Sequence, residues 1–171
     1  LGASIQDQKD DRKRFENNEG EKGSTVVDQL ESFTSLGAFG LGSYNQGNFS
    51  VQAGLRFDLH EISLDDNLII DPQFGVPYAD YSTLLRSYSP NIGLIYNLNK
   101  NKEVYINFGK SYETPSLSEL STNPSGSGFN SELSPMISKG LDLGLRKKSN
   151  SISYNIAAFY IDTKDEIVRY E

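Results

Sequence analysis

The only histidine of this sequence, His60, is the side chain best suited to chemistry, and it lies close to two carboxylates, Asp58 and Glu61. A zinc site needs several ligands that converge on one point, and one histidine with scattered carboxylates does not supply such a set. A Ser-His-Asp triad would require this same histidine, and no nucleophile-elbow motif accompanies it. We therefore predict a structural histidine, no metal site and no catalytic site, so the chain is not expected to be an enzyme.

Two further motifs favour solvated loops over chemistry. The Gly-Ser-Gly segment at 126–128 is not followed by the Gly-Lys-Ser/Thr sequence of a phosphate-binding loop. The adjacent acids at 10–11 and at 65–66 are better explained as loop charges than as a glycosidase pair. The sequence has no cysteine, so it can form neither a disulfide nor a thiolate metal site.

Two groups of side chains remain as candidates for a functional role. The first consists of Arg56, Asp58 and Arg146, which fall on the polar face of the predicted strands, where they either contact another part of the protein or are simply solvated. The second lies in a predicted long loop, where aromatic and arginine side chains together can hold an anionic ligand, although such residues are more often ordinary loop surface. Its members are Tyr78, Asp80, Tyr81 and Arg86.

The composition favours strands as the elements that position these residues. Ten Tyr and nine Phe accompany an apolar content of only 36%, and aromatic residues are enriched in strands. The net charge of −7 argues against nucleic acid as a partner and against a polybasic membrane anchor. No run of about 18 apolar residues is present, so no membrane-spanning helix is predicted.

Alternation of apolar and polar residues predicts the strands directly. Residues 49–59 place six apolar side chains on one face and only polar residues or glycine on the other, so a slip of one residue would exchange the two faces. Residues 88–98 and 104–111 alternate in the same way around a short polar turn, which predicts a hairpin. The segments 139–147 and 152–161 continue the pattern.

The remaining segments divide into one further strand, short turns and long connections. Residues 25–44 could form a helix by apolar spacing, but their glycines favour a long strand. Short turns are predicted at 45–48, 99–102 and 148–150, and long connections at 10–24, 65–87 and 113–135. All short turns then lie at one end of the sheet and all long loops at the other, as in outer-membrane barrels.

The predicted fold is therefore all-β: an antiparallel up-and-down meander of about seven strands, part of a transmembrane β-barrel. In such a barrel the apolar face is turned to lipid and the polar face to a wet or plugged lumen. The residues expected to face lipid include Val51, Leu55, Leu94, Ile106, Leu143 and Ile156.

Five segments resemble, in order, parts of TonB-dependent outer-membrane receptors. They are AGLRFDLH at 53–60, similar to GLRYD; YSPNIGLIYNL at 88–98, similar to FSPRVGLVYQ; VYINFGKSYETPSLSEL at 104–120, similar to YASYGRGFRTPSLSEL; SELSPMISKGLDLGLR at 131–146, similar to NPNLKPEKSWNYELGLR; and AAFYIDTKDEIV at 157–168, similar to TAFYIDVKDQI. Their order and spacing match from about Leu36 onward, which makes the resemblance far more specific than any one phrase.

The resemblance implies a receptor in the outer membrane of a Gram-negative bacterium that takes up a scarce nutrient, above all a ferric siderophore, with energy supplied through TonB. Residues 1–171 would form part of the barrel, about seven of roughly 22 strands, without a plug domain or a TonB box. The implied partners are the receptor's own plug domain, the TonB system, the ligand and membrane lipid, with no cofactor. Arg56, Asp58 and Arg146 would then face the plug.

Two other kinds of protein share this pattern of strands. A passive outer-membrane porin has the same sheet without a plug. A soluble β-sandwich or lipocalin-like binding module would bury the apolar face and expose the polar one.

Overall fold

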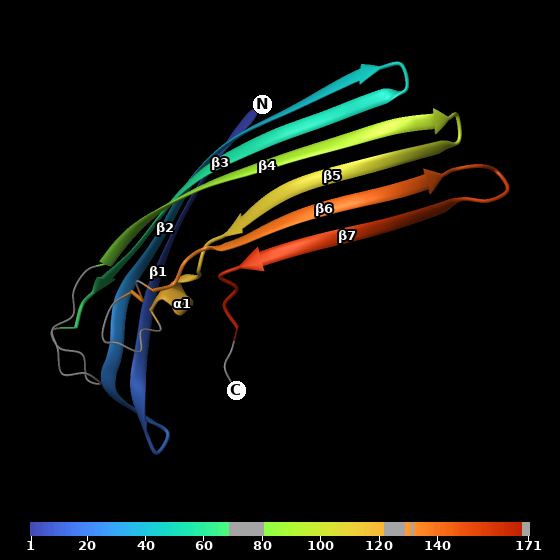
Figure 1. The fold of residues 1–171 in the computed structure, drawn as a ribbon. Coiled ribbons are helices and arrows are strands. Elements are labelled where there is room, and N and C mark those ends of the chain that lie inside the picture. The colour runs from blue at the N-terminus through green and yellow to red at the C-terminus, as the bar shows by residue number, and fades with distance from the viewer. Residues whose placement is uncertain (69–80, 122–128, 131, 169–171) are drawn as a thin grey trace.

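The computed structural model describes residues 1–68, 81–121, 129–130 and 132–168. Seven strands form one antiparallel sheet in which every strand pairs with its neighbours in the sequence (Figure 1). This confirms the predicted seven-stranded meander. The strands are β1 (Gly2–Asn18), β2 (Glu21–Gln46), β3 (Phe49–Asp66), β4 (Tyr81–Asn99), β5 (Lys102–Glu113), β6 (Met136–Lys147) and β7 (Tyr154–Lys164), and the helix α1 (Leu117–Leu120) follows β5.

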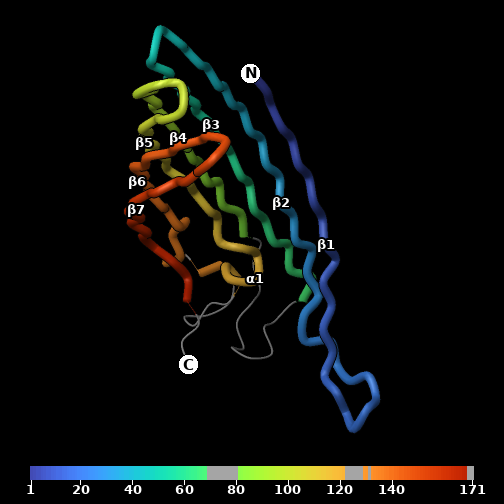
Figure 2. The backbone as a smooth tube through the Cα atoms, turned by 90° about the vertical axis from the view of Figure 1, so that its right-hand side faces the viewer, coloured from blue at the N-terminus to red at the C-terminus, as the bar shows by residue number. Residues whose placement is uncertain are grey.

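The strand register divides the sheet into two faces. We call the face that carries Leu55 and Leu143 the outer face, and the face that carries Arg56 and Asp58 the concave face. The sheet curls from β1 round to β7, and α1 lies on the hollow side of the curl (Figure 2). The residues just before and in α1 border a hollow together with concave-face residues of β1 to β3, which places the concave face inside the curl.

The outer face carries the apolar residues that were predicted to share one side. Val51 pairs with Leu94, which pairs with Ile106, which in turn pairs with Leu143. Leu55 lies on the same face of β3 as Val51, and Ile156 of β7 lies on the same face of the sheet as Leu143. The side chains of Leu143 and Ile156 are 57% and 65% exposed. A single layer of strands thus leaves a broad apolar surface uncovered, where a β-sandwich would bury it against a second sheet.

The buried apolar core of the described residues is small and lies on the concave face. Ile62 is 1% exposed, and Leu64 and Leu120 are each 4% exposed. Ile62 and Leu64 follow His60 on the same face of β3, and Ile62 lies beside the segment that leads into α1. The chain therefore excludes water where the β5–β6 connection folds back inside the curl, rather than between two layers.

The prediction of a loop over residues 10–24 is wrong, because β1 and β2 run through this segment as one hairpin that projects beyond the other strands (Figure 1). A two-residue turn closes it, with positive φ at Glu19 and Gly20, as tight hairpin turns require. Phe15 is the only apolar residue in the sequence from 10 to 24, so the apolar alternation that reveals a strand is missing. Lys13 pairs with Asp28 at 3.3 Å across the two strands.

Smaller differences concern where elements begin and end. The strand β3 runs on to Asp66, so Asp65 and Asp66 are strand residues and not loop charges. The strand β4 starts at Tyr81, several residues earlier than predicted, and β7 starts at Tyr154, two residues later than predicted. The segment 113–135 contains the short helix α1. No helix within the described residues is long and apolar enough to cross a membrane.

Candidate ligand-binding face

The concave face carries a polar cluster that joins three strands at the middle of β3. Arg56 donates two hydrogen bonds to Asp58, from Nε to Oδ2 at 2.8 Å and from Nη2 to Oδ1 at 2.6 Å. The same Nη2 donates to Ser4 Oγ of β1 at 3.2 Å. Asp58 is only 6% exposed, and a bidentate arginine contact is the strong, geometrically fixed way to satisfy a buried carboxylate.

Glycine at position 37 makes this cluster possible. A Cβ atom at Gly37 would lie within 2.6 Å of atoms of Arg56, Asp58 and Ser4. Because β2 lies between β1 and β3, only a residue without a side chain lets Arg56 reach across it. Phe39, two residues further along β2, places its ring 5.8 Å from the Arg56 guanidinium and holds it from the other side.

Three stacked rings continue this face toward the long connections. The His60 ring lies 5.7 Å from that of Phe33 and 6.4 Å from that of Tyr112, centroid to centroid. Tyr112 reaches His60 because the β4–β5 ladder ends at Gly109, after which β5 separates from β4. His60 Nδ1 is buried and has no hydrogen-bond partner among the described residues. The predicted structural histidine therefore lies inside an aromatic stack and keeps one unused polar atom.

A hollow of about 290 Å³ opens at this separation of β4 and β5. Its lining combines the charged pair, the histidine and hydroxyl groups, which are groups that recognise a polar ligand through directed hydrogen bonds. The lining residues are Arg56, Asp58, His60, Ser87, Ser89, Lys110, Ser111 and Tyr112.

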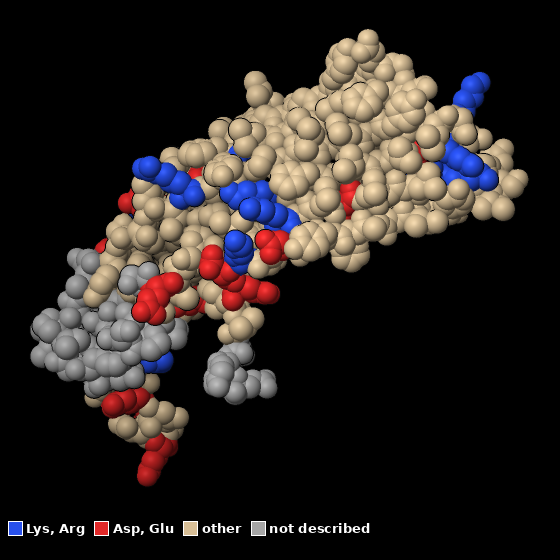
Figure 3. All heavy atoms as spheres, in the orientation of Figure 1, with Lys and Arg blue, Asp and Glu red and all other residues tan. Residues whose placement is uncertain are grey.

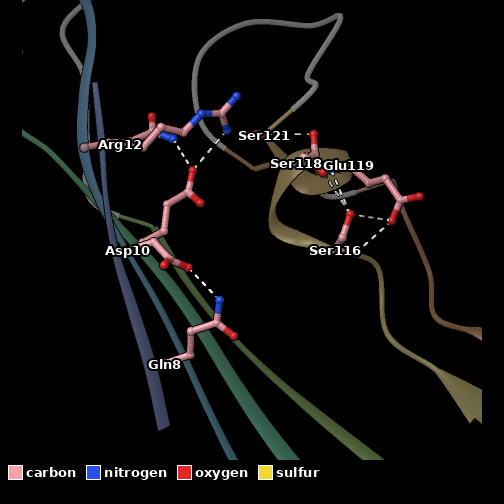
Figure 4. Close-up of polar contacts among 9 residues, drawn as sticks. Gln8, Asp10, Arg12, Ser116, Ser118, Glu119 and Ser121 are labelled. Atoms are coloured by element: carbon pink, nitrogen blue, oxygen red, sulfur yellow. Dashed lines mark hydrogen bonds and ion pairs between the residues drawn. The ribbon is translucent and has the colours of Figure 1, made fainter. Parts of the chain in front are cut away.

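A second hollow, of about 390 Å³, lies between β1–β3 and the segment that leads into α1. Its wall includes Glu31, which is 8% exposed and accepts hydrogen bonds from Arg12 at 3.1 Å and from Gln29 at 2.6 Å. On β1, Gln8 donates to Asp10 at 2.6 Å. Figure 4 shows this row of polar side chains with Arg12 extending toward α1.

A capping box fixes the side of this hollow formed by α1. Ser116 N donates to Glu119 Oε2 at 2.8 Å, and Glu119 N donates to Ser116 Oγ at 3.3 Å (Figure 4). These reciprocal bonds satisfy two amide groups that a helix start otherwise leaves unpaired. The Ser-x-x-Glu spacing is visible in the sequence and could have revealed this helix.

The predicted lumen residues do not form one site. Arg56 and Asp58 are brought together, but Arg146 lies near the short turns at the other end of the sheet. There it donates to Glu103 at 2.7 Å and lies 5.1 Å from the Tyr105 ring. All three nevertheless lie on the concave face, as their strand parity predicted.

The predicted loop group is divided by β4. Tyr81 and Arg86 belong to this strand and not to a loop, which corrects their predicted setting. Tyr81 lies on the concave face, and its ring centroid is 6.0 Å from that of Phe129. Arg86 pairs with Leu59 and so points to the outer face, away from the hollows. Tyr78 and Asp80 lie outside the described residues.

Sequence reasoning missed the residues that build the second hollow. Arg12 was assigned to a solvated loop, and Gln29 and Glu31 lie in a segment that was recognised only as a strand. Their role depends on pairing between β1 and β2, which an alternation pattern within one strand cannot reveal. Within the described part of the chain, no group of three or more His, Cys, Asp or Glu side chains is arranged to hold a metal ion.

Comparisons with known proteins agree with this architecture. Residues 2–171 match a family model described as TonB dependent receptor-like, beta-barrel. Among solved structures, the fold is similar to that of a protein named copper transporter OprC, with a TM-score of 0.70 and 15% sequence identity. The match covers 96% of this chain and 26% of that one, so this chain spans about a quarter of its length. At this level of identity the similarity concerns the fold alone.

Proposed function

This chain belongs to the TonB-dependent receptor β-barrel family, a family of the bacterial outer membrane, and we propose that the protein containing it imports a scarce nutrient across that membrane. In this proposal a plug domain of the same protein lies against the concave face, and the TonB system supplies the energy. The residues described here contribute one wall of the barrel and part of the surface that a ligand meets.

The observation that carries the proposal is the contrast between the two faces. The outer face presents uncovered apolar side chains such as Leu55 and Leu143, which suits contact with lipid. The concave face presents paired charges, amides and hydroxyls around two hollows, which suits contact with water and a polar ligand.

For the ligand we propose a ferric siderophore, a hydrophilic organic chelate. The Arg56–Asp58 cluster and the Arg12–Glu31 cluster offer directed donors and acceptors, and the stack of Phe33, His60 and Tyr112 offers aromatic edges and faces. Hydrogen bonds and stacking recognise the organic shell of a chelate rather than the bare ion. Tyr78, Asp80 and Tyr81 are proposed to add contacts from the outside.

Uptake by the full-length protein tests this function. We would express it in a strain that lacks its own ferric-siderophore receptors and measure accumulation of radioactive iron supplied with a panel of siderophores. The proposal expects uptake of at least one chelate, and loss of that uptake when TonB is deleted. Uptake that persists without TonB would indicate a passive porin.

A parallel measurement with copper salts separates the ligand from the transport mechanism. TonB-dependent accumulation of copper without accumulation of any ferric chelate would overturn the siderophore proposal and leave active transport intact. Saturable binding by a protein that stays monomeric and stable without detergent would instead support a soluble binding module.

A further inference from the structure

Three adjacent strands each carry a basic side chain where the apolar part of the outer face ends. The residues are Arg86 on β4, Lys110 on β5 and Lys139 on β6. Each is the first charged residue on the outer face of its strand, counted from the apolar middle toward the long connections. Figure 3 shows Lys and Arg side chains gathered over this part of the molecule.

Two of the three cations are direct neighbours, and the cations outnumber the carboxylates on this part of the outer face. Lys110 is directly opposite Lys139 in the β5–β6 ladder, an arrangement that places like charges side by side and is destabilising on its own. Lys110 Nζ lies 3.6 Å from the centroid of the Tyr88 ring, and Tyr88 is two residues from Arg86 on the same face. Among the described residues, none of these three cations forms an ion pair.

Two carboxylates offset this charge only in part. Glu61 of β3 lies two residues beyond Leu59, the partner of Arg86, on the same face. Asp162 of β7 is opposite Lys139 in the β6–β7 ladder, and Lys164 lies two residues further along the same face of β7. The surface therefore keeps an excess of positive charge. An anion bound between Lys110 and Lys139 would relieve their repulsion.

An apolar hollow of about 410 Å³ lies beside this basic surface on the outer face of β1 to β3. Leu59 in its wall is paired with Arg86, and Phe57 is paired with Tyr88, so the hollow begins one strand away from the cations. Small residues at its centre leave room between larger apolar ones. The lining residues are Ala3, Ser4, Ile5, Leu36, Gly37, Ala38, Phe57 and Leu59.

We propose that this surface binds one anionic lipid of the outer leaflet, a phosphorylated glycolipid. Its phosphate groups lie against Arg86, Lys110 and Lys139, and one of its acyl chains fills the apolar hollow. The end of the sheet with long connections is the outward end in this family of barrels, so the cations lie at the headgroup level of the outer leaflet. Basic residues at that level attract anionic headgroups, and a tyrosine beside them suits the membrane interface. The lipid site does not depend on which nutrient the protein transports.

The experiment measures the lipid that stays bound to the full-length protein when it is extracted from outer membranes in mild detergent. Native mass spectrometry counts the glycolipid molecules bound to each protein molecule. The compact mobility of the unheated protein on gels shows that each variant is folded. Lys110→Gln combined with Lys139→Gln should lower the retained glycolipid by about tenfold, since each basic residue at the membrane surface contributes several-fold to anionic lipid binding.

A matched control uses the second lysine pair of the same two strands. Lys102 and Lys147 are also directly opposite each other on the outer face, but at the end with short turns. Lys102→Gln combined with Lys147→Gln makes the same change in charge and should leave the retained glycolipid unchanged. Equal retention by wild type and the Lys110/Lys139 variant, or an equal loss in the control, would overturn the proposal.

Two further measurements separate a lipid site from a simple anion site. Ala38→Phe, which fills the hollow, should lower glycolipid retention, whereas Ala158→Phe on the outer face of β7 should not. A large excess of inorganic phosphate should fail to displace the lipid, because the acyl chain holds it as well. Full displacement by phosphate, or no effect of Ala38→Phe, would contradict the lipid assignment.

Discussion

Replacement of Leu143 by arginine tests the assignment of the two faces most directly. Leu143 lies on the outer face of β6, four residues from Lys139 and four from Lys147. At about 3.4 Å per residue, each lysine is about 14 Å away along the strand. A strand tilt of about 40° reduces this distance to a depth of about 10 Å. The two lysines therefore bracket an apolar band of roughly 20 Å with Leu143 at its centre, close to the band height of outer-membrane barrels.

An arginine at the middle of such a band costs about 2–4 kcal/mol. This lowers the ratio of folded to unfolded protein by about 30-fold to 1,000-fold. The full-length protein, folded into lipid vesicles, should accordingly unfold at a lower urea concentration. The dependence on urea should stay the same, because the surface exposed on unfolding does not change.

The control places the same arginine one residue earlier. Asp142 lies on the concave face opposite Asn107, so Asp142→Arg should change the free energy of unfolding by less than about 0.5 kcal/mol, as for most exposed substitutions. Asn107→Ser on the same face should also cost little. Equal losses from Leu143→Arg and Asp142→Arg would refute the assignment of the outer face to lipid.

Three further substitutions probe the concave face. Asp58→Ala should destabilise the full-length protein by about 1–3 kcal/mol in urea titrations, because the partly buried Arg56 guanidinium loses both of its hydrogen bonds to the carboxylate. A loss below about 0.5 kcal/mol would contradict a stabilising role for this pair. Gly37→Val should lower the free energy of unfolding by about 1–3 kcal/mol through overpacking. Gly42→Ala serves as the control, because nothing lies within 4 Å of a Cβ atom at that position. Similar losses in both variants would show that space at position 37 is not limiting. Ser116→Ala removes the capping box and should cost about 0.5–2 kcal/mol of local stability, measured as faster hydrogen exchange in α1; unchanged exchange would argue against the cap.

The sequence was sufficient to predict the strands that have one apolar face. Such a face imposes a strict alternation, so residues 49–59 and 88–98 could be assigned to strands and to faces before the pairing was known. The glycines of 25–44 likewise separated a strand from a helix, and β2 confirms that choice. The register then follows, because a slip of one residue would turn Arg56 to the lipid side.

The same reasoning fails where both faces are wet. The end of the β1–β2 hairpin has no regular apolar side, so Arg12 and Lys13 looked like loop charges although they form ion pairs between strands. Asp28, the partner of Lys13, also accepts a hydrogen bond from Asn67 at 3.1 Å, and this bond lowers the pKa of the Asp28 carboxyl below its ordinary value. Contacts of this kind join residues that are distant in the sequence, and no local pattern encodes them.

The charges on the outer face also indicate how deep the Arg56–Asp58 pair and Arg146 lie along the strands. The first charged residue on the outer face is Glu61 on β3, which pairs with Leu84, whereas on β4 it is Arg86, nearer the short turns. From β3 to β4 this boundary moves toward the turns, as expected when strands cross the membrane at a tilt of about 35–45°. On β3, Asp58 and Arg56 lie only a few residues below Glu61, so their cluster is level with the outer leaflet. Arg146, one residue from Lys147, lies at the opposite boundary. In the proposed function, a ligand that arrives from outside would therefore meet Arg56 and Asp58 first, and Arg146 only after it has crossed the barrel.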